Sequence, residues 1–208
     1  MQTVPHEFAP KDLIAGHVAL DFTNTVTARD TTPRDWLDGY GRFIEWARLA
    51  CVVDAATAAR LESMAQRAPR EAAAALGRAR KVREALHAVC VALLRREEPP
   101  GEALDEVEAA WKRAASRGRL AAGQRQLRLV PDLDASGFDL PLDVVVFEAL
   151  GLLSELDADR TRVCRGHDCG WLFADTSKSG RRVWCDMATC GNTAKSERFA
   201  RGRRRKNH

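Results

Sequence analysis

Four cysteines near the end of the chain have the spacing of a metal site. Cys164 and Cys169 are separated by four residues, Cys185 and Cys190 are also separated by four, and fifteen residues lie between the two pairs. Two close pairs on a short connector can converge on one tetrahedral ion. Four thiolates suit Zn²⁺ and leave no open position for water. The spacing therefore predicts one structural zinc ion bound by these four residues.

Other interpretations of these residues stay open. The four could be unrelated buried thiols, or His167, inside the first pair, could replace one ligand. A disulfide is disfavoured in a reducing compartment. Cys51 and Cys90 fall on expected helices and are interpreted as core residues.

The residues around the cysteines predict a small, metal-dependent module. Segments 171–174 and 182–185 are expected to form the two strands of a β-hairpin, with a turn at 176–180. Gly166, Gly170 and Gly191 are expected to supply unusual backbone angles at the zinc knuckles. So small a unit cannot be stabilised by burial alone, whereas metal binding supplies about 10–16 kcal/mol in comparable peptides.

Basic residues gather in the same part of the chain. Residues 160–208 contain 13 Lys and Arg against 4 Asp and Glu, a net charge of +9, while residues 1–159 carry −5. Asn192 can cap a helix in which basic side chains recur every three or four residues. Arginine binds phosphate oxygens in bidentate pairs, and such contacts release counterions, so this pattern predicts a nucleic-acid interface. The candidate contacts are Arg181, Arg182, Lys195, Arg198, Arg201, Arg203, Arg204, Arg205 and Lys206. A solvated basic tail is the alternative.

A second group of polar residues follows an apolar run near the N-terminus. His17, Asp21, Asn24 and Thr25 could line a pocket for a small-molecule effector. The alternative is that they cap their own backbone. Arg83 is a candidate buried partner for Asp21. The chain has no nucleophile elbow, phosphate loop or metalloprotease helix, so we expect it not to be an enzyme.

Most of the chain is predicted to be helical. Apolar residues recur at helical spacing over 36–49, 70–97, 102–117 and 141–156, and Asp54 is expected to cap a further helix that ends at Pro69. Short strands are expected at 17–23 and 126–130, with 132–137 as a hairpin loop. The predicted fold class is mainly α (α+β): a helical domain with a short strand or hairpin, followed by a Cys₄ module made of a zinc knuckle, a β-hairpin and a basic helix.

Composition limits the remaining possibilities. Of the 208 residues, 45% are apolar and 30% charged, which is typical of a soluble globular protein. No membrane span and no secretory signal are evident, so a cytoplasmic location is expected. The charged connector 157–162 predicts a boundary between domains 1–158 and 159–208. A single small finger usually needs a second contact surface for specificity, so a homodimer is possible.

Two motifs resemble a known family. The first is Cys164-x₄-Cys169-Gly-Trp-Leu-Phe-Ala-Asp-Thr-Ser, with Arg181-Arg-Val-Trp-Cys185-x₄-Cys190-Gly-Asn192; the second is Gly16-His-Val-Ala-Leu-Asp-Phe-Thr-Asn-Thr25. Together they resemble the bacterial CGNR zinc-finger proteins with an N-terminal ABATE domain, a group regarded as stress-related transcription regulators. The resemblance implies DNA binding through the zinc module. RNA binding has the same signature, and a protein-interaction module with structural zinc is a further alternative. Thr193 stands where the family has Arg, which removes one charge from the helix start.

Overall fold

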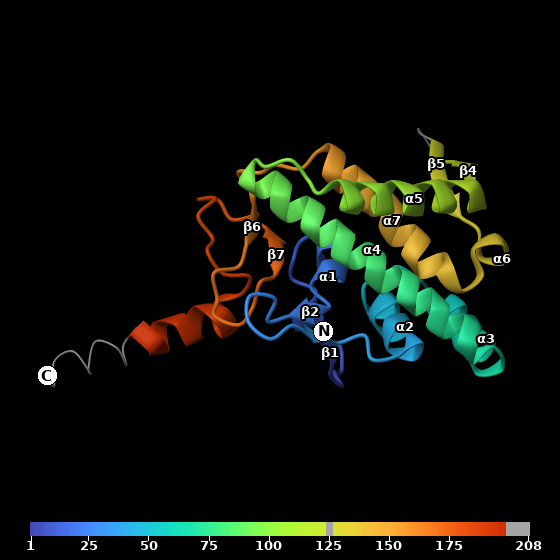
Figure 1. Ribbon diagram of the computed structural model, residues 1–208, viewed down its shortest axis with the longest axis horizontal. Coiled ribbons are helices and arrows are strands. Elements are labelled where there is room, and N and C mark those ends of the chain that lie inside the picture. Colours follow the sequence, from blue (N-terminus) through green and yellow to red (C-terminus); the bar gives the residue numbers. More distant parts are fainter. Residues whose placement is uncertain (124–126, 199–208) are drawn as a thin grey trace, which may run out of the picture.

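A long helix organises the computed structural model, which describes residues 1–123 and 127–198 (Figure 1). Helix α4 (Pro69–Arg95) begins with a proline in its first turn and ends at Arg96, which adopts a left-handed conformation at φ 56°. Its 27 residues correspond to a length of about 40 Å. Helices α5 (Gly101–Arg117) and α7 (Leu140–Ser154) pack against α4. The other α-helices before the C-terminal module are α1 (Val18–Thr23), α2 (Tyr40–Leu49), α3 (Ala55–Arg67) and α6 (Leu133–Ser136), with 3₁₀ turns at Pro10–Asp12 and Gly137–Asp139. In the C-terminal module a π-helical turn at Met187–Gly191 leads into a helical segment at 192–198.

Three small sheets complete the architecture. In the first sheet, β3 (Arg34–Asp35) lies between β1 (Gln2–Thr3), which runs parallel to it, and β2 (Val26–Thr27), which runs antiparallel. The second sheet is an antiparallel pair of β4 (Gly118–Ala122) and β5 (Leu127–Pro131). The third is an antiparallel pair of β6 (Thr161–Val163) and β7 (Leu172–Ala174). The fold is therefore mostly helical, as the sequence predicts.

The buried apolar residues form two clusters. The larger cluster lies among α1, α2, α3, α4, α5 and α7, and Phe22, Phe43 and Trp46 are its largest fully buried aromatic residues. The smaller cluster joins Leu20 of α1 and Cys90 of α4 to the C-terminal module through Leu172 and Phe173. Because one cluster contains residues from both ends of the chain, the module packs against the helical region.

The predicted strand at 17–23 is wrong, since α1 occupies these residues. His17 caps this helix, and its Nδ1 accepts the Ala19 backbone N–H at 3.2 Å. Leu20 and Phe22 of this short helix are fully buried. The burial of these side chains on two different sides of α1, together with the cap, stabilises the helix. The helix is too short for an apolar periodicity to reveal it in the sequence.

Three further expectations are corrected. Trp36 directly follows β3 and precedes α2 instead of belonging to it, because the helix begins only at Tyr40, after the extended residue Gly39. Residues 132–137 include α6, which Asp132 caps, so the β4–β5 turn lies earlier in the chain. In the C-terminal module, β7 pairs with β6 and not with 182–185. By contrast, Asp54 caps α3 as predicted, accepting the Thr57 N–H at 2.7 Å. Gln126 of the strand predicted at 126–130 lies outside the described residues.

Candidate metal centre and nucleic-acid interface

The sulfur atoms of the four predicted cysteines converge. The Sγ atoms of Cys164, Cys169, Cys185 and Cys190 all lie within 4.8 Å of one another. The Cys169–Cys185 and Cys185–Cys190 sulfur separations are both 3.7 Å. Tetrahedral zinc with Zn–S bonds of about 2.3 Å places its sulfur ligands about 3.8 Å apart. The cluster therefore has the donor set and the size that one zinc ion requires.

Backbone N–H groups surround the sulfur of Cys164. Gly166 and Cys185 donate to it over 3.3 and 3.2 Å. Hydrogen bonds from the other three thiols, that of Cys169 first, together with the Cys185 N–H, lower the pKa of Cys164, whereas the hydrogen bond with Cys164 raises the pKa of Cys169 and of Cys185. In the metal-free cluster the thiolate, the form of cysteine that binds metal, is therefore favoured at Cys164.

The glycines at the metal centre are required there for different physical reasons. Gly170 has φ +75°, as expected from the sequence. Gly166 and Gly191 do not have positive φ; instead, a Cβ on Gly166 would lie 2.8 Å from the side chain of Cys190. Asp168 takes the second left-handed conformation of the first knuckle, with φ 61°. Gly166 is therefore required for space and not for backbone angle.

The N-terminal residues bind the backbone of β7. The side-chain amide of Asn24 donates to the Leu172 carbonyl oxygen at 2.8 Å, and its Oδ1 accepts the Leu172 N–H at 2.9 Å. The Ala174 N–H donates to the Ala15 carbonyl oxygen at 2.7 Å. Asn24 is 2% exposed, so both of its hydrogen bonds are buried. This amide thereby replaces a neighbouring strand.

The first knuckle is also bound by the loop that joins β2 and β3. The Arg29 N–H donates to the Cys169 carbonyl oxygen at 3.4 Å. Arg34 forms an ion pair of 2.8 Å with Asp168, and the Thr31 hydroxyl donates to the same carboxylate. The metal centre is thus fixed to the helical region through main-chain and side-chain contacts.

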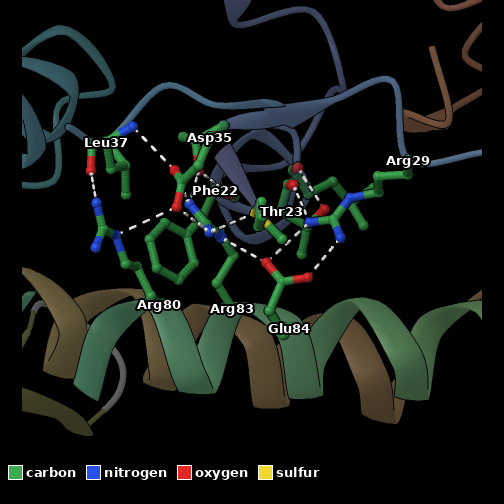
Figure 2. Close-up of polar contacts among 11 residues, drawn as sticks. Phe22, Thr23, Arg29, Asp35, Leu37, Arg80, Arg83 and Glu84 are labelled. Atoms are coloured by element: carbon green, nitrogen blue, oxygen red, sulfur yellow. Dashed lines mark hydrogen bonds and ion pairs between the residues drawn. The ribbon is translucent and has the colours of Figure 1, made fainter. Parts of the chain in front are cut away.

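Beneath this loop lies a buried network of charges (Figure 2). Arg83, which is 1% exposed, forms a bidentate pair with Asp35 at 2.7 and 2.8 Å. Glu84 accepts from both Arg83, at 2.9 Å, and Arg29, at 2.6 Å, while Arg80 approaches Asp35 at 3.2 Å. The network therefore links α4, β3 and the loop that contacts Cys169.

The expected pairing of Arg83 with Asp21 is wrong, because Arg83 binds Asp35. Asp21 accepts the Ala15 N–H at 2.9 Å, and burial raises the pKa of Asp21 to about 7. The Thr25 hydroxyl accepts from Arg83 at 3.0 Å and donates to the Phe22 carbonyl. Each of these residues thus makes at least one side-chain hydrogen bond within the protein, and an effector-binding role for His17, Asp21, Asn24 and Thr25 stays a prediction.

Sequence reasoning missed the partners of Arg83. One signal was available: Arg83 lies on the helix face between the apolar residues Ala79 and Leu86, where an unpartnered charge would be costly. That Asp35 is this partner depends on where β3 lies relative to α4. The apolar periodicity of the sequence gives no information about that placement.

The predicted basic residues have different surroundings. Arg181 is exposed, whereas Arg182 donates to the Trp184 carbonyl at 3.1 Å and lies 4.7 Å above the Phe173 ring. Lys195 and Arg198 are exposed on the helical segment 192–198, which extends away from the rest of the molecule (Figure 1). Arg201, Arg203, Arg204, Arg205 and Lys206 lie outside the described residues.

Two family models match the chain. Residues 16–162 match the ABATE family, described as "Putative stress-induced transcription regulator", and residues 160–206 match the CGNR zinc finger. The first match covers more than half of the chain, so the chain belongs to the ABATE family and carries a C-terminal CGNR zinc finger. The family description indicates a regulator of transcription. A comparison with curated proteins gave no match.

Proposed function

We propose that this chain is a transcription regulator that binds duplex DNA through its CGNR zinc finger. The observation that carries the proposal is the converged Cys₄ cluster directly before the helical segment 192–198. One zinc ion bound there would fix the start of this segment, because Cys190 is the last ligand before it. The exposed Lys195 and Arg198 are three residues apart, so they share one face of the helix.

These two side chains are proposed to contact phosphates, and the basic residues up to Lys206 to add further contacts. Thr193, in the position of the family's Arg, is exposed at the start of the segment and supplies no charge. We place the regulator in the cytoplasm and propose a domain boundary between residues 158 and 159. Among the helices of the described residues, none is both long and apolar enough to span a bilayer.

Metal analysis and a binding titration test the proposal. The purified chain is expected to contain one zinc per molecule. With about six phosphates neutralised, the logarithm of the affinity for a labelled mixed-sequence duplex should fall against the logarithm of salt concentration with a slope near −5. Zinc-loaded protein that does not bind the duplex at low salt would refute DNA binding.

A matched pair of variants locates the contact. Lys195→Ala/Arg198→Ala should reduce the magnitude of the slope by about 2. Arg67→Ala/Arg70→Ala removes the same charge from exposed positions at the opposite end of the molecule and should leave the slope unchanged (Figure 1). Tighter binding to single-stranded RNA than to the duplex would favour RNA as the ligand. An acidic protein partner would remain bound in the presence of excess DNA.

A further inference from the structure

A cleft lined by arginines lies where the zinc finger meets the long helix. Its volume is about 460 Å³, and it is bordered by the last turn of α4, strand β6, the first knuckle and the segment before Cys185. None of the described residues that line it is acidic. The arginines of this cleft, which we call the arginine cleft, are Arg95, Arg162, Arg165, Arg181 and Arg182.

Two of these arginines stabilise the finger. Arg162 donates to the Gly180 carbonyl at 2.7 Å and approaches the buried carboxylate of Asp175 at 3.7 Å. Arg182 donates to the Trp184 carbonyl and lies over an aromatic ring. Their guanidinium groups thus hold the connector between the two cysteine pairs in place.

The other three arginines have no such role. The side chains of Arg95, Arg165 and Arg181 are exposed and have no hydrogen bond or ion pair with any residue in 1–123 or 127–198. Like charges gathered around one cleft repel one another, and the resulting positive potential attracts a polyanion. The free donors of three guanidinium groups match the oxygens of successive phosphates.

A neighbouring hollow connects this cleft to the helical segment 192–198. The hollow has a volume of about 740 Å³, shares Arg165 and Val183 with the arginine cleft, and reaches Trp184 and Arg198. Its lining also includes the acidic residues Asp30 and Glu197. Phosphates are therefore better accommodated in the arginine cleft than in the hollow.

We propose that the arginine cleft binds the phosphodiester backbone of duplex DNA and that Arg95, a residue of the helical region, contacts it. This inference rests on the proposed function and extends it, because the DNA-binding surface then includes α4 as well as the zinc finger. Arg165 lies between the cleft and the hollow, so a strand bound in the cleft can continue toward Arg198.

The test compares single substitutions in the full-length, zinc-loaded chain. Arg95→Ala should weaken binding to a labelled mixed-sequence duplex by roughly three- to tenfold at low salt and reduce the magnitude of the salt slope by about 1. Arg95→Lys keeps the charge and should retain most of the affinity. Arg70→Ala, on the same helix at the opposite end, is the matched control and should bind as the unmodified chain does.

The outcomes separate the two proposals. If Arg95→Ala binds as tightly as Arg70→Ala while Arg181→Ala binds more weakly, contact is confined to the finger and the inference about α4 is overturned. If the unmodified chain does not bind the duplex, the proposed function itself fails. Because Arg95 is exposed and unpartnered, circular dichroism should show an unchanged fold in each Arg95 variant.

Discussion

Asn24 is expected to control the attachment of the zinc finger to the helical region. Asn24 is 2% exposed, and its side-chain amide forms two hydrogen bonds with the backbone of Leu172, at 2.8 and 2.9 Å. Asn24→Ala leaves a buried N–H and a buried carbonyl without partners, each at a cost of about 1–3 kcal/mol. The free energy of unfolding should therefore fall by about 2–6 kcal/mol.

Urea denaturation of the zinc-loaded chain, followed by circular dichroism and tryptophan fluorescence, measures this change. Hydrogen exchange adds a local reading, because the Leu172 N–H should exchange faster in Asn24→Ala. The matched control is Asn192→Ala, which removes an exposed amide that donates to the Ala188 carbonyl oxygen four residues earlier and should change stability by less than about 0.5 kcal/mol.

A third variant, Asn24→Asp, tests whether the two hydrogen bonds to Leu172 account for the stability that Asn24 provides. In Asn24→Asp a protonated carboxyl group can replace both bonds, whereas an ionised one faces the Leu172 carbonyl oxygen. The stability lost in this variant should therefore grow as the pH rises. The argument is refuted if Asn24→Ala is as stable as Asn192→Ala and the Leu172 N–H exchanges at an unchanged rate.

Three further predictions concern the metal, the buried charges and pH. A chelator should remove one zinc per chain and unfold the finger. Metal analysis should show that Cys164→Ser lowers the zinc content, while Cys51→Ser, at an exposed cysteine, does not. Equal zinc content in the two variants would contradict the proposed zinc site. Arg83→Met should lower the free energy of unfolding by about 3–5 kcal/mol in urea, because it leaves Asp35 buried without its bidentate partner, and a change below 1 kcal/mol would contradict this. Since burial raises the pKa of Asp21 from 3.8 to about 7, the folded state retains a proton that the unfolded state releases, so stability should fall as the pH rises through this window. Asp21→Asn keeps an oxygen for the same backbone N–H and should flatten that part of the curve; superimposable pH profiles would show that Asp21 is not responsible.

Arg29 contacts both the metal centre and the long helix. The loop containing Arg29 contacts the Cys169 carbonyl, and Arg29 also binds Glu84 of α4. The backbone and the side chain of Arg29 therefore join the metal centre to the long helix.

The sequence by itself determined the metal centre and the main helices. The spacing of Cys164, Cys169, Cys185 and Cys190 identifies the ligands because thiolate pairs on short turns converge on zinc by local geometry. The apolar periodicity of 70–97 predicts α4 because a long helix repeats its pattern many times. Both signals are contained in short stretches of chain.

Only the tertiary structure decided how the zinc finger is held. The replacement of a strand by the amide of Asn24 and the partnership of Arg83 with Asp35 join residues far apart in the chain, and β7 pairs with the preceding strand β6 instead of with 182–185. The arginine cleft likewise forms where α4 meets residues that follow it by about seventy positions. No local pattern encodes such contacts, because their geometry depends on the packing of every element between them.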